Sequence, residues 1–168
     1  QTTGPEILKD FAGRQLDFWV TGWGTGGTLT GAGEMIKLAR PEVQIIATEP
    51  AGASLLGGKA WAPHKIQGWT PDFLPDVLNP KVFDQLLPVT DEEGKQMARR
   101  LAREEGIFVG ISAGATLAAA VKAAETAKPG SVLLAMLPDT GERYLGTYLF
   151  DDLNAGSDDE WLASLDKK

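Results

Sequence analysis

The chain has 168 residues, 43% of them hydrophobic, a formal net charge of −7 and no cysteine. This length suits one domain or most of one, and the net negative charge argues against binding nucleic acid or an anionic membrane, which both require a basic face. The absence of cysteine excludes disulfides and thiolate metal sites, and no apolar run reaches the roughly 18 residues of a membrane-spanning helix.

Strands and helices alternate in the first part of the chain. A proline in the first turn and a glycine at the end predict a helix over residues 5–13, and the apolar run LDFWV predicts a strand over 16–20. A helix should follow over 28–39, ended by Pro41, and then a strand over 43–50. The second strand is almost continuously apolar, which is typical of a parallel sheet covered on both faces.

Residues 50–80 are rich in glycine and proline and predict no regular element. Long segments of this kind in a compact domain are usually either functional or disordered. The aromatic residues Trp61, Trp69 and Phe73 argue against disorder. We therefore expect an ordered loop with a functional role.

The second part of the chain continues the alternation. A strand is expected over 83–89, followed by a helix that begins with a capping box formed by Thr90 and Glu93 and ends at Gly106. An alanine-rich helix should run over 112–127 and a strand over 131–137. The pattern predicts an α/β fold with a mainly parallel, twisted sheet and helices on both faces. We assign residues 1–152 to one domain and 153–168 to an acidic tail, in which 158–165 could form a short helix.

The glycine-rich stretch VTGWGTGGTLTG allows three interpretations. The first is a dinucleotide-binding loop, because Gly22, Gly24 and Gly27 match G-x-G-x-x-G after a strand and before a helix. Glu49 ends the next strand, where an acidic residue binds a ribose hydroxyl in such folds.

The second interpretation is a cup for a single phosphate. The run Gly24, Thr25, Gly26, Gly27 and Thr28 offers consecutive backbone N–H groups, two hydroxyl donors and the positive end of a helix. The third is a tight turn that binds nothing, which the entropic cost of so many glycines disfavours. The residues alone leave these alternatives open.

Two polar residues outside this loop also have two interpretations each. Ser112 stands at the start of the alanine-rich helix, so its hydroxyl could cap that helix or face a ligand at the strand ends. His64, the single histidine, could be a general base or a structural residue, and Gln67 and Gly68 could form a segment that closes over a substrate. We find no carboxylate pair, zinc-ligand spacing or nucleophile elbow in the sequence.

Five motifs in this chain, TTGPEI, GTGGTLTG, PHKIQG, GISAGA and LPDTGERYL, occur together in one known family. In this order and spacing they resemble the cysteine synthases, or O-acetylserine sulfhydrylases, which are fold-type II enzymes dependent on pyridoxal phosphate. The resemblance covers residues 2–152 and corresponds to roughly the C-terminal half of the family. It favours the phosphate-cup interpretation over the dinucleotide one.

The resemblance implies a role for each matched residue. Gly24, Thr25, Gly26, Gly27 and Thr28 would bind the cofactor phosphate, and Ser112 would hydrogen-bond the pyridine nitrogen. A serine there leaves the ring nitrogen largely neutral, which favours β-elimination and β-replacement over transamination. Gly68 would lie near the substrate amino group, and Phe108 near a small-anion or sulfide site.

The resemblance also implies an activity and partners. We expect L-cysteine to be formed from O-acetyl-L-serine and sulfide, with the Schiff-base lysine outside this chain and no catalytic residue within it. Expected partners are the N-terminal portion of the same enzyme, a second copy in a homodimer and the C-terminal tail of serine acetyltransferase, all in the cytoplasm. Alternatives are a cystathionine β-synthase-like enzyme and a non-catalytic fragment that binds pyridoxal phosphate or phosphate.

One loop departs from the family pattern. After HKIQG many members read IGAGF, whereas this chain reads WTPDF, with Trp69, Thr70, Pro71 and Asp72 at the changed positions. We expect Trp69 and Pro71 to stiffen or fill this loop and so to alter substrate entry. Ala113 replaces a second serine that is common in GISSGA, and we expect little effect from that change.

Overall fold

Four parallel strands form the centre of the molecule, in the order β3-β2-β1-β4. The computed structural model describes residues 2–153 and 156. The strands are β1 (Phe18–Gly22), β2 (Gln44–Thr48), β3 (Gln85–Leu86) and β4 (Leu133–Ala135). The helices are α1 (Thr3–Asp10), α2 (Gly27–Ala39), α3 (Asp91–Glu105), α4 (Ile111–Thr126) and the 3-10 helix η1 (Gly141–Tyr144).

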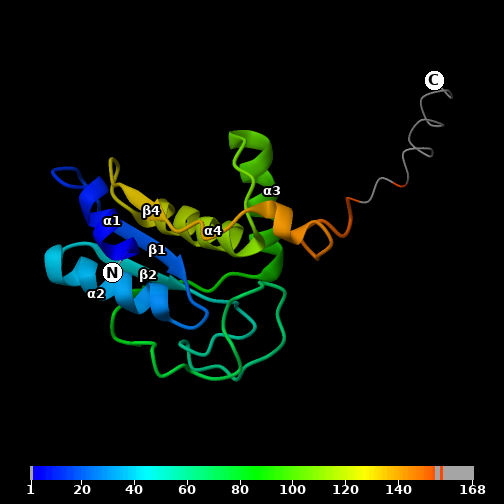
Figure 1. Cartoon of the computed structure of the whole chain (residues 1–168), viewed down its shortest axis with the longest axis horizontal. Coiled ribbons are helices and arrows are strands. Elements are labelled where there is room, and N and C mark those ends of the chain that lie inside the picture. The colour runs from blue at the N-terminus through cyan, green and yellow to red at the C-terminus, as the bar shows by residue number, and fades with distance from the viewer. Residues whose placement is uncertain (1, 154–155, 157–168) are drawn as a thin grey trace.

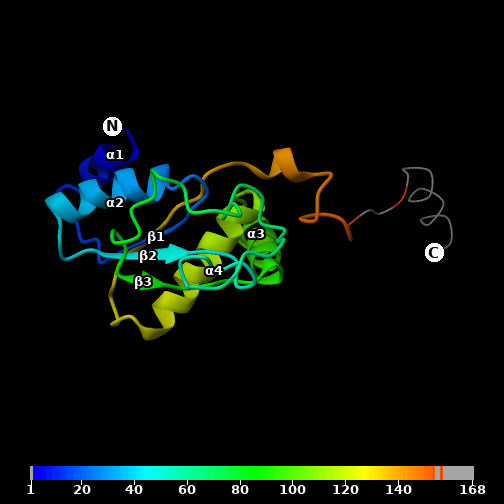
Figure 2. The ribbon, with the colours of Figure 1, turned by 90° about the horizontal axis from the view of Figure 1, so that it is seen from below.

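Helices cover both faces of this sheet (Figure 1). Helices α1 and α2 lie on one face, while α4 lies on the other with α3 packed against it, as the view in Figure 2 also shows. The predicted α/β fold with a parallel sheet is therefore confirmed. The short helix expected over 158–165 lies outside the described residues.

Side chains of β1 point alternately into two apolar cores. Trp19 packs with Leu29 and Ile36 of α2, whereas Val20 packs with the alanine-rich face of α4. Both β1 residues are fully buried, because a parallel strand covered by helices has no solvent-facing side. The continuous apolar character of the strand sequences follows from this arrangement.

Small residues bring α3 and α4 close together. A Cβ on Gly114 of α4 would lie 2.6 Å from Cβ of Ala98 in α3, and one on Gly94 would lie 3.1 Å from Cβ of Ala115. Close approach of this kind requires glycine or alanine at the contact. It explains the composition of α4 and places its first residues at the carboxyl ends of the strands.

Helix ends show one prediction confirmed and one wrong. The capping box of α3 is present, since Thr90 Oγ1 accepts from the N–H of Glu93 and the Glu93 carboxylate accepts from the N–H of Thr90. Helix α4 begins one residue earlier than expected, at Ile111, with Gly110 at the N-cap and no side-chain cap. Ser112 is thus inside the first turn and is not the capping residue.

The segment between β2 and β3 contains no helix or strand, as predicted. It is nevertheless anchored, because Ile66 and Thr70 are fully buried and Trp69 is 8% exposed. Strand β3 is shorter than the expected 83–89 and is supplemented by an isolated parallel bridge between Pro50 and Val89. In the described part of the chain no helix combines the length and apolar character that crossing a membrane requires.

Candidate functional site

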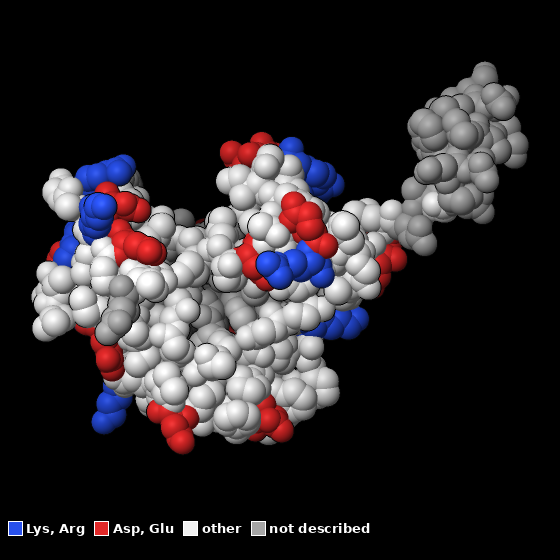
Figure 3. Space-filling view, in the orientation of Figure 1, with Lys and Arg blue, Asp and Glu red and all other residues white. Residues whose placement is uncertain are grey.

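A cavity of about 240 Å³ opens at the carboxyl end of β1. Four parts of the chain line it: residues 21–29, residues 67–69, Ser112 with Thr116 in α4, and the segment after β4, which contributes Met136, Pro138, Asp139 and Tyr144. In the space-filling view the middle of the face is hollowed and mostly uncharged, and Lys, Arg, Asp and Glu lie mainly toward its rim (Figure 3). Open parallel sheets bind ligands at this end of the strands.

The start of α2 presents unpaired donors to this cavity. The helix begins at Gly27, its N-cap Gly26 has φ +86°, and no side chain caps it. The first backbone bond of the turn runs from Thr30 to Gly26, and no acceptor among the described residues receives the N–H groups of Gly27, Thr28 and Leu29. Unpaired donors together with the positive helix end form an anion site.

Packing explains most of the glycines in this loop. A Cβ on Gly22 would overlap the indole of Trp69, one on Gly24 would overlap the carbonyl oxygen of Gly68, and one on Gly26 would lie 2.7 Å from Cβ of Leu78. By contrast, a Cβ on Gly27 would meet only the Thr25 hydroxyl, at 3.7 Å. The G-x-G spacing thus reflects close packing of the loop, while the backbone of Gly27 is open.

Glu49 is fully buried and its carboxylate is occupied by the protein. It accepts hydrogen bonds from Trp23 Nε1 at 3.1 Å, from the backbone N–H of Gly57 at 3.0 Å and Leu56 at 3.2 Å, and from the Ser54 hydroxyl. No acceptor capacity remains for a ribose hydroxyl. The dinucleotide interpretation is therefore wrong.

Ser112 lies at the first turn of α4 and lines the same cavity as the glycine loop. The residue is 5% exposed, and the structure records no hydrogen bond for its hydroxyl within the described residues. Its carbonyl is satisfied by Thr116 Oγ1 at 3.0 Å. A nearly buried hydroxyl without a partner is available to a ligand in the cavity.

Asp139 and Tyr144 are cavity residues that the sequence analysis did not single out. The Tyr144 hydroxyl donates to Asp139 Oδ2, while Asp139 Oδ1 is buried without a partner among the described residues. Burial, and then the hydrogen bond to Asp139, raise the pKa of the Tyr144 phenol to about 12. Both lie in the motif LPDTGERYL, which contributed to the resemblance but carried no assigned role.

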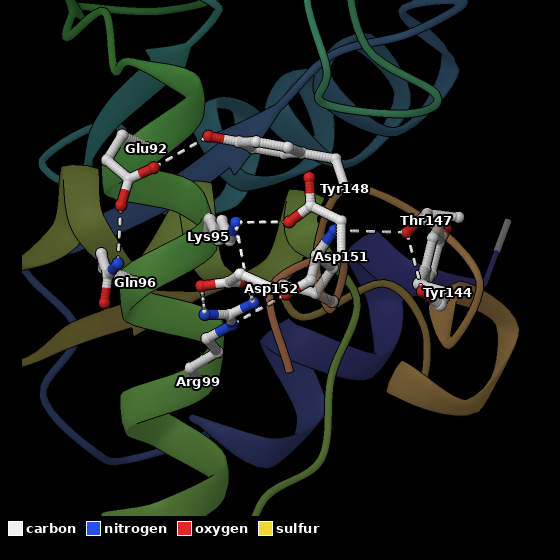
Figure 4. Close-up of polar contacts among 10 residues, drawn as sticks. Glu92, Lys95, Gln96, Arg99, Tyr144, Thr147, Tyr148, Asp151 and Asp152 are labelled. Carbon is white, nitrogen blue, oxygen red and sulfur yellow. Dashed lines mark hydrogen bonds and ion pairs between the residues drawn. The ribbon is translucent and has the colours of Figure 1, made fainter. Parts of the chain in front are cut away.

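Ion pairs hold the segment that follows these residues against α3 (Figure 4). Lys95 Nζ lies 2.7 Å from Asp151 and 3.1 Å from Asp152, and Arg99 Nη1 donates to Asp152 at 3.0 Å. The Arg99 and then the Lys95 hydrogen bonds hold the pKa of the Asp152 carboxyl well below its usual value. Tyr148, from the same segment, donates to Glu92 at 2.8 Å. These contacts fix the segment on α3.

The remaining predicted residues divide into two groups. Gly68 lines the cavity with φ +82°, which favours glycine. Phe108 does not line it; its ring packs against Phe150 at a centroid distance of 5.6 Å, so its substrate role stays a prediction. His64 also lies outside this cavity, where Nε2 contacts the carbonyl of Thr70 at 3.2 Å, in agreement with a structural role.

Comparison with known proteins shows the family. A profile described as "Pyridoxal-phosphate dependent enzyme" matches residues 1–139. The chain is 58% identical to O-ureido-L-serine synthase of Streptomyces lavendulae over 166 residues, covering 99% of this chain and 51% of the relative. It is 43% identical to a cysteine synthase of Staphylococcus aureus over 153 residues, covering 90% and 49%.

Solved structures agree with these relatives. A crystal structure of O-ureido-L-serine synthase with O-ureido-L-serine bound matches with a TM-score of 0.90 at 59% identity, covering 98% of this chain and 51% of that one. An O-acetylserine sulfhydrylase from Entamoeba histolytica matches with a TM-score of 0.85 at 36% identity, covering 97% and 49%. The chain spans about half the length of these relatives. It belongs to the pyridoxal-phosphate dependent enzymes, and its fold matches about half of a cysteine synthase-like member of that family.

Proposed function

We propose that the protein catalyses β-replacement on an O-acylated L-serine, with this chain binding the pyridoxal phosphate. One observation supports this above the others. The N–H groups at the start of α2 and the hydroxyl of Ser112, all without a partner among the described residues, line a single cavity at the strand ends. A phosphate and a polar ring atom of one ligand could satisfy both sets of groups.

The residues present fit this cofactor. The backbone of Gly24, Thr25, Gly26, Gly27 and Thr28 would bind the phosphate dianion, because consecutive N–H groups and a helix N-terminus stabilise that charge. The Ser112 hydroxyl would hydrogen-bond the pyridine nitrogen. Bound there, pyridoxal phosphate supplies an electron sink for the charge that develops when a substrate loses its α-proton.

Ser112 also influences which reaction is favoured. A serine hydroxyl has no carboxylate charge, so it can share a hydrogen bond with the ring nitrogen without stabilising a positive charge on it. A largely neutral ring withdraws electrons less strongly, which favours loss of a β-substituent over transamination. The single buried serine at this place therefore supports β-replacement.

The overall reaction balances without an oxidant or reductant. The bond between the serine β-carbon and the ester oxygen breaks, and acetate leaves with its electron pair. A nucleophile forms the new bond to the β-carbon and loses its proton, and the proton taken from the α-carbon returns to it. We also propose that the lysine that moves this proton belongs to the N-terminal half that the relatives contain beyond the matched region.

We further propose that the product is O-ureido-L-serine, formed when the oxygen of hydroxyurea attacks. The 58% identity over nearly the whole chain to an O-ureido-L-serine synthase supports this choice over a cysteine synthase at 43%. The second candidate is L-cysteine formed from sulfide, which the cysteine synthase relatives support. Both reactions share the same serine donor and differ only in the nucleophile.

The test uses the protein that carries this chain together with that N-terminal half. O-acetyl-L-serine is supplied with hydroxyurea, sulfide or homocysteine, and the product is identified by mass spectrometry. We expect O-ureido-L-serine to form with a higher kcat/KM than L-cysteine. Cystathionine as the main product would replace this proposal with the cystathionine β-synthase alternative, and cofactor binding without any product would indicate a non-catalytic protein.

A further inference from the structure

Trp69 forms one wall of the cavity and lies directly on the glycine loop. The residue is 8% exposed and lines the cavity together with Gly22. The contact is so close that a Cβ on Gly22 would overlap Cε2, Cζ2 and Nε1 of the indole. The indole therefore lies against the start of the glycine loop, two residues before the part that would bind the cofactor phosphate.

The residue after Trp69 is held in an unusual backbone conformation. Thr70 has φ +36°, the only positive φ outside glycine among the described residues, and it is fully buried. Its N–H donates to the carbonyl of Trp23 at 3.0 Å, and its own carbonyl accepts from Trp61 Nε1 at 3.0 Å and contacts His64 Nε2 at 3.2 Å. A strained β-branched residue persists only where its surroundings determine its conformation.

The other side of Trp69 is anchored as well. The backbone N–H of Lys65 donates to Asp91 Oδ2 at 3.0 Å, and Lys65 Nζ lies 4.1 Å from the centre of the Tyr148 ring. The same ring lies 4.3 Å from Lys95 Nζ and belongs to the contacts drawn in Figure 4. Anchors before and after Trp69 fix the backbone that carries the indole.

The indole of Trp69 suits a ligand that contains a planar amide group. An indole offers a flat apolar face and one N–H donor, and Nε1 of Trp69, which lines the cavity, takes part in no hydrogen bond among the described residues. A ureido group is planar and carries a carbonyl acceptor, whereas sulfide is small and has neither feature. Isoleucine, which the cysteine synthase pattern places here, has no donor and no flat face.

From this geometry we propose that Trp69 determines the nucleophile, and that its indole binds the ureido group of hydroxyurea in preference to sulfide. This inference rests on the proposed β-replacement activity and adds a residue that selects its substrate. Thr70, Trp61 and His64 act as positioning residues, because they hold the backbone next to Trp69 and do not themselves line the cavity.

The test compares Trp69→Ile and Trp69→Phe with the unmodified protein, in the form that contains both halves. For Trp69→Ile we expect the ratio of kcat/KM with hydroxyurea to kcat/KM with sulfide to fall by about tenfold or more, mainly through the KM for hydroxyurea. Trp69→Phe keeps an aromatic face and loses the N–H, so its kcat/KM ratio should lie between the ratios of Trp69→Ile and the unmodified protein. The Kd of O-ureido-L-serine, measured by calorimetry, should rise more than the Kd of L-cysteine.

Phe73→Ile is the matched control, because Phe73 is an exposed aromatic residue of the same loop, outside the cavity. Its ratio should stay within about twofold of the unmodified protein. If Trp69→Phe melts at the normal temperature and both Trp69 variants keep the original ratio, the role of Trp69 is refuted while β-replacement stands. If the unmodified protein yields neither product, the proposed function fails first and this inference fails with it.

Discussion

The carbonyl oxygen of Gly68 lies so close to Gly24 that no Cβ fits on Gly24. This contact joins the glycine loop that follows β1 to the long segment between β2 and β3, and both line the cavity. The same two segments meet again where Trp69 covers Gly22. Glycine in this loop is thus required by contact with another part of the chain.

Replacing Gly24 by alanine should separate these two segments. The added methyl group meets a backbone carbonyl, which cannot rotate away as a flexible side chain could, so we expect a loss of about 1–3 kcal/mol in the free energy of unfolding. Urea denaturation measures this change. The matched control is Gly31→Ala in α2, where a Cβ meets nothing within 4 Å and should stabilise the helix by about 0.5–1 kcal/mol. Equal effects of the two variants would contradict the contact.

Ser112→Ala should weaken cofactor binding without unfolding the protein. The hydroxyl makes no recorded bond within the described residues, so its loss costs the folded protein little, while the bound cofactor loses one hydrogen bond. We expect the Kd for pyridoxal phosphate to rise about threefold to tenfold, as for one neutral hydrogen bond. A spectroscopic titration measures it, with Ser131→Ala, in the turn before β4, as the control. An unchanged Kd would remove Ser112 from the binding site.

Glu49→Gln should destabilise the protein although the two side chains have nearly the same shape. The carboxylate accepts from four donors, and an amide nitrogen cannot replace one of its oxygens as an acceptor. We expect a loss of about 1–3 kcal/mol in the free energy of unfolding. Glu105→Gln, at the exposed end of α3, serves as the control and should have almost no effect. If Glu49→Gln changed the free energy of unfolding as little as Glu105→Gln does, Glu49 would not make these hydrogen bonds.

Alkaline titration should distinguish Tyr144 from an ordinary tyrosine. The chain has two tyrosines, and burial raises the pKa of Tyr144 to about 12, while the hydrogen bond to Glu92 raises the pKa of Tyr148. A raised phenol pKa means that Tyr144 stabilises the fold below its unfolded pKa of 10.0, and that this contribution is lost as the pH rises through about 12. Tyrosinate absorbance should therefore develop mostly above pH 10, and Tyr144→Phe should remove the component near pH 12. A component that titrates fully at pH 10 would disprove the burial of this phenol.

Acid should weaken the attachment of the segment at 148–152 to α3. Arg99 and Lys95 lower the pKa of Asp152, so the pair stabilises the fold above the unfolded value of about 3.8, and this stabilisation is lost as the pH falls through the lower folded pKa. Asp152→Asn should lower the melting temperature at pH 7, and the difference from the unmodified protein should shrink in strong acid. Asp76→Asn, an exposed residue for which no ion pair is recorded among the described residues, should show no such trend. A difference that is independent of pH would exclude the ion pair as its cause.

The sequence by itself determined the local elements of this protein. Apolar periodicity, the Thr90–Glu93 capping box and the glycine and proline breaks predicted the alternating helices and strands, because these signals act within a few residues. The five motifs also indicated the family and the phosphate-binding loop, since a glycine-rich run before a helix is a local sequence pattern that predicts closely spaced backbone donors.

Contacts between distant segments were decided only in the tertiary structure. Glu49 matches the dinucleotide pattern in the sequence, but in the fold it is buried and accepts hydrogen bonds from four donors. Ser112 matches an N-cap in the sequence, but α4 begins at Ile111 and Gly110 is the N-cap. Asp139 and Tyr144 enter the cavity because β4 pairs with β1 and brings the following segment to the same sheet end. Such relationships depend on which residues come into contact after the chain folds, and local sequence patterns do not specify contacts between residues that are far apart in the chain.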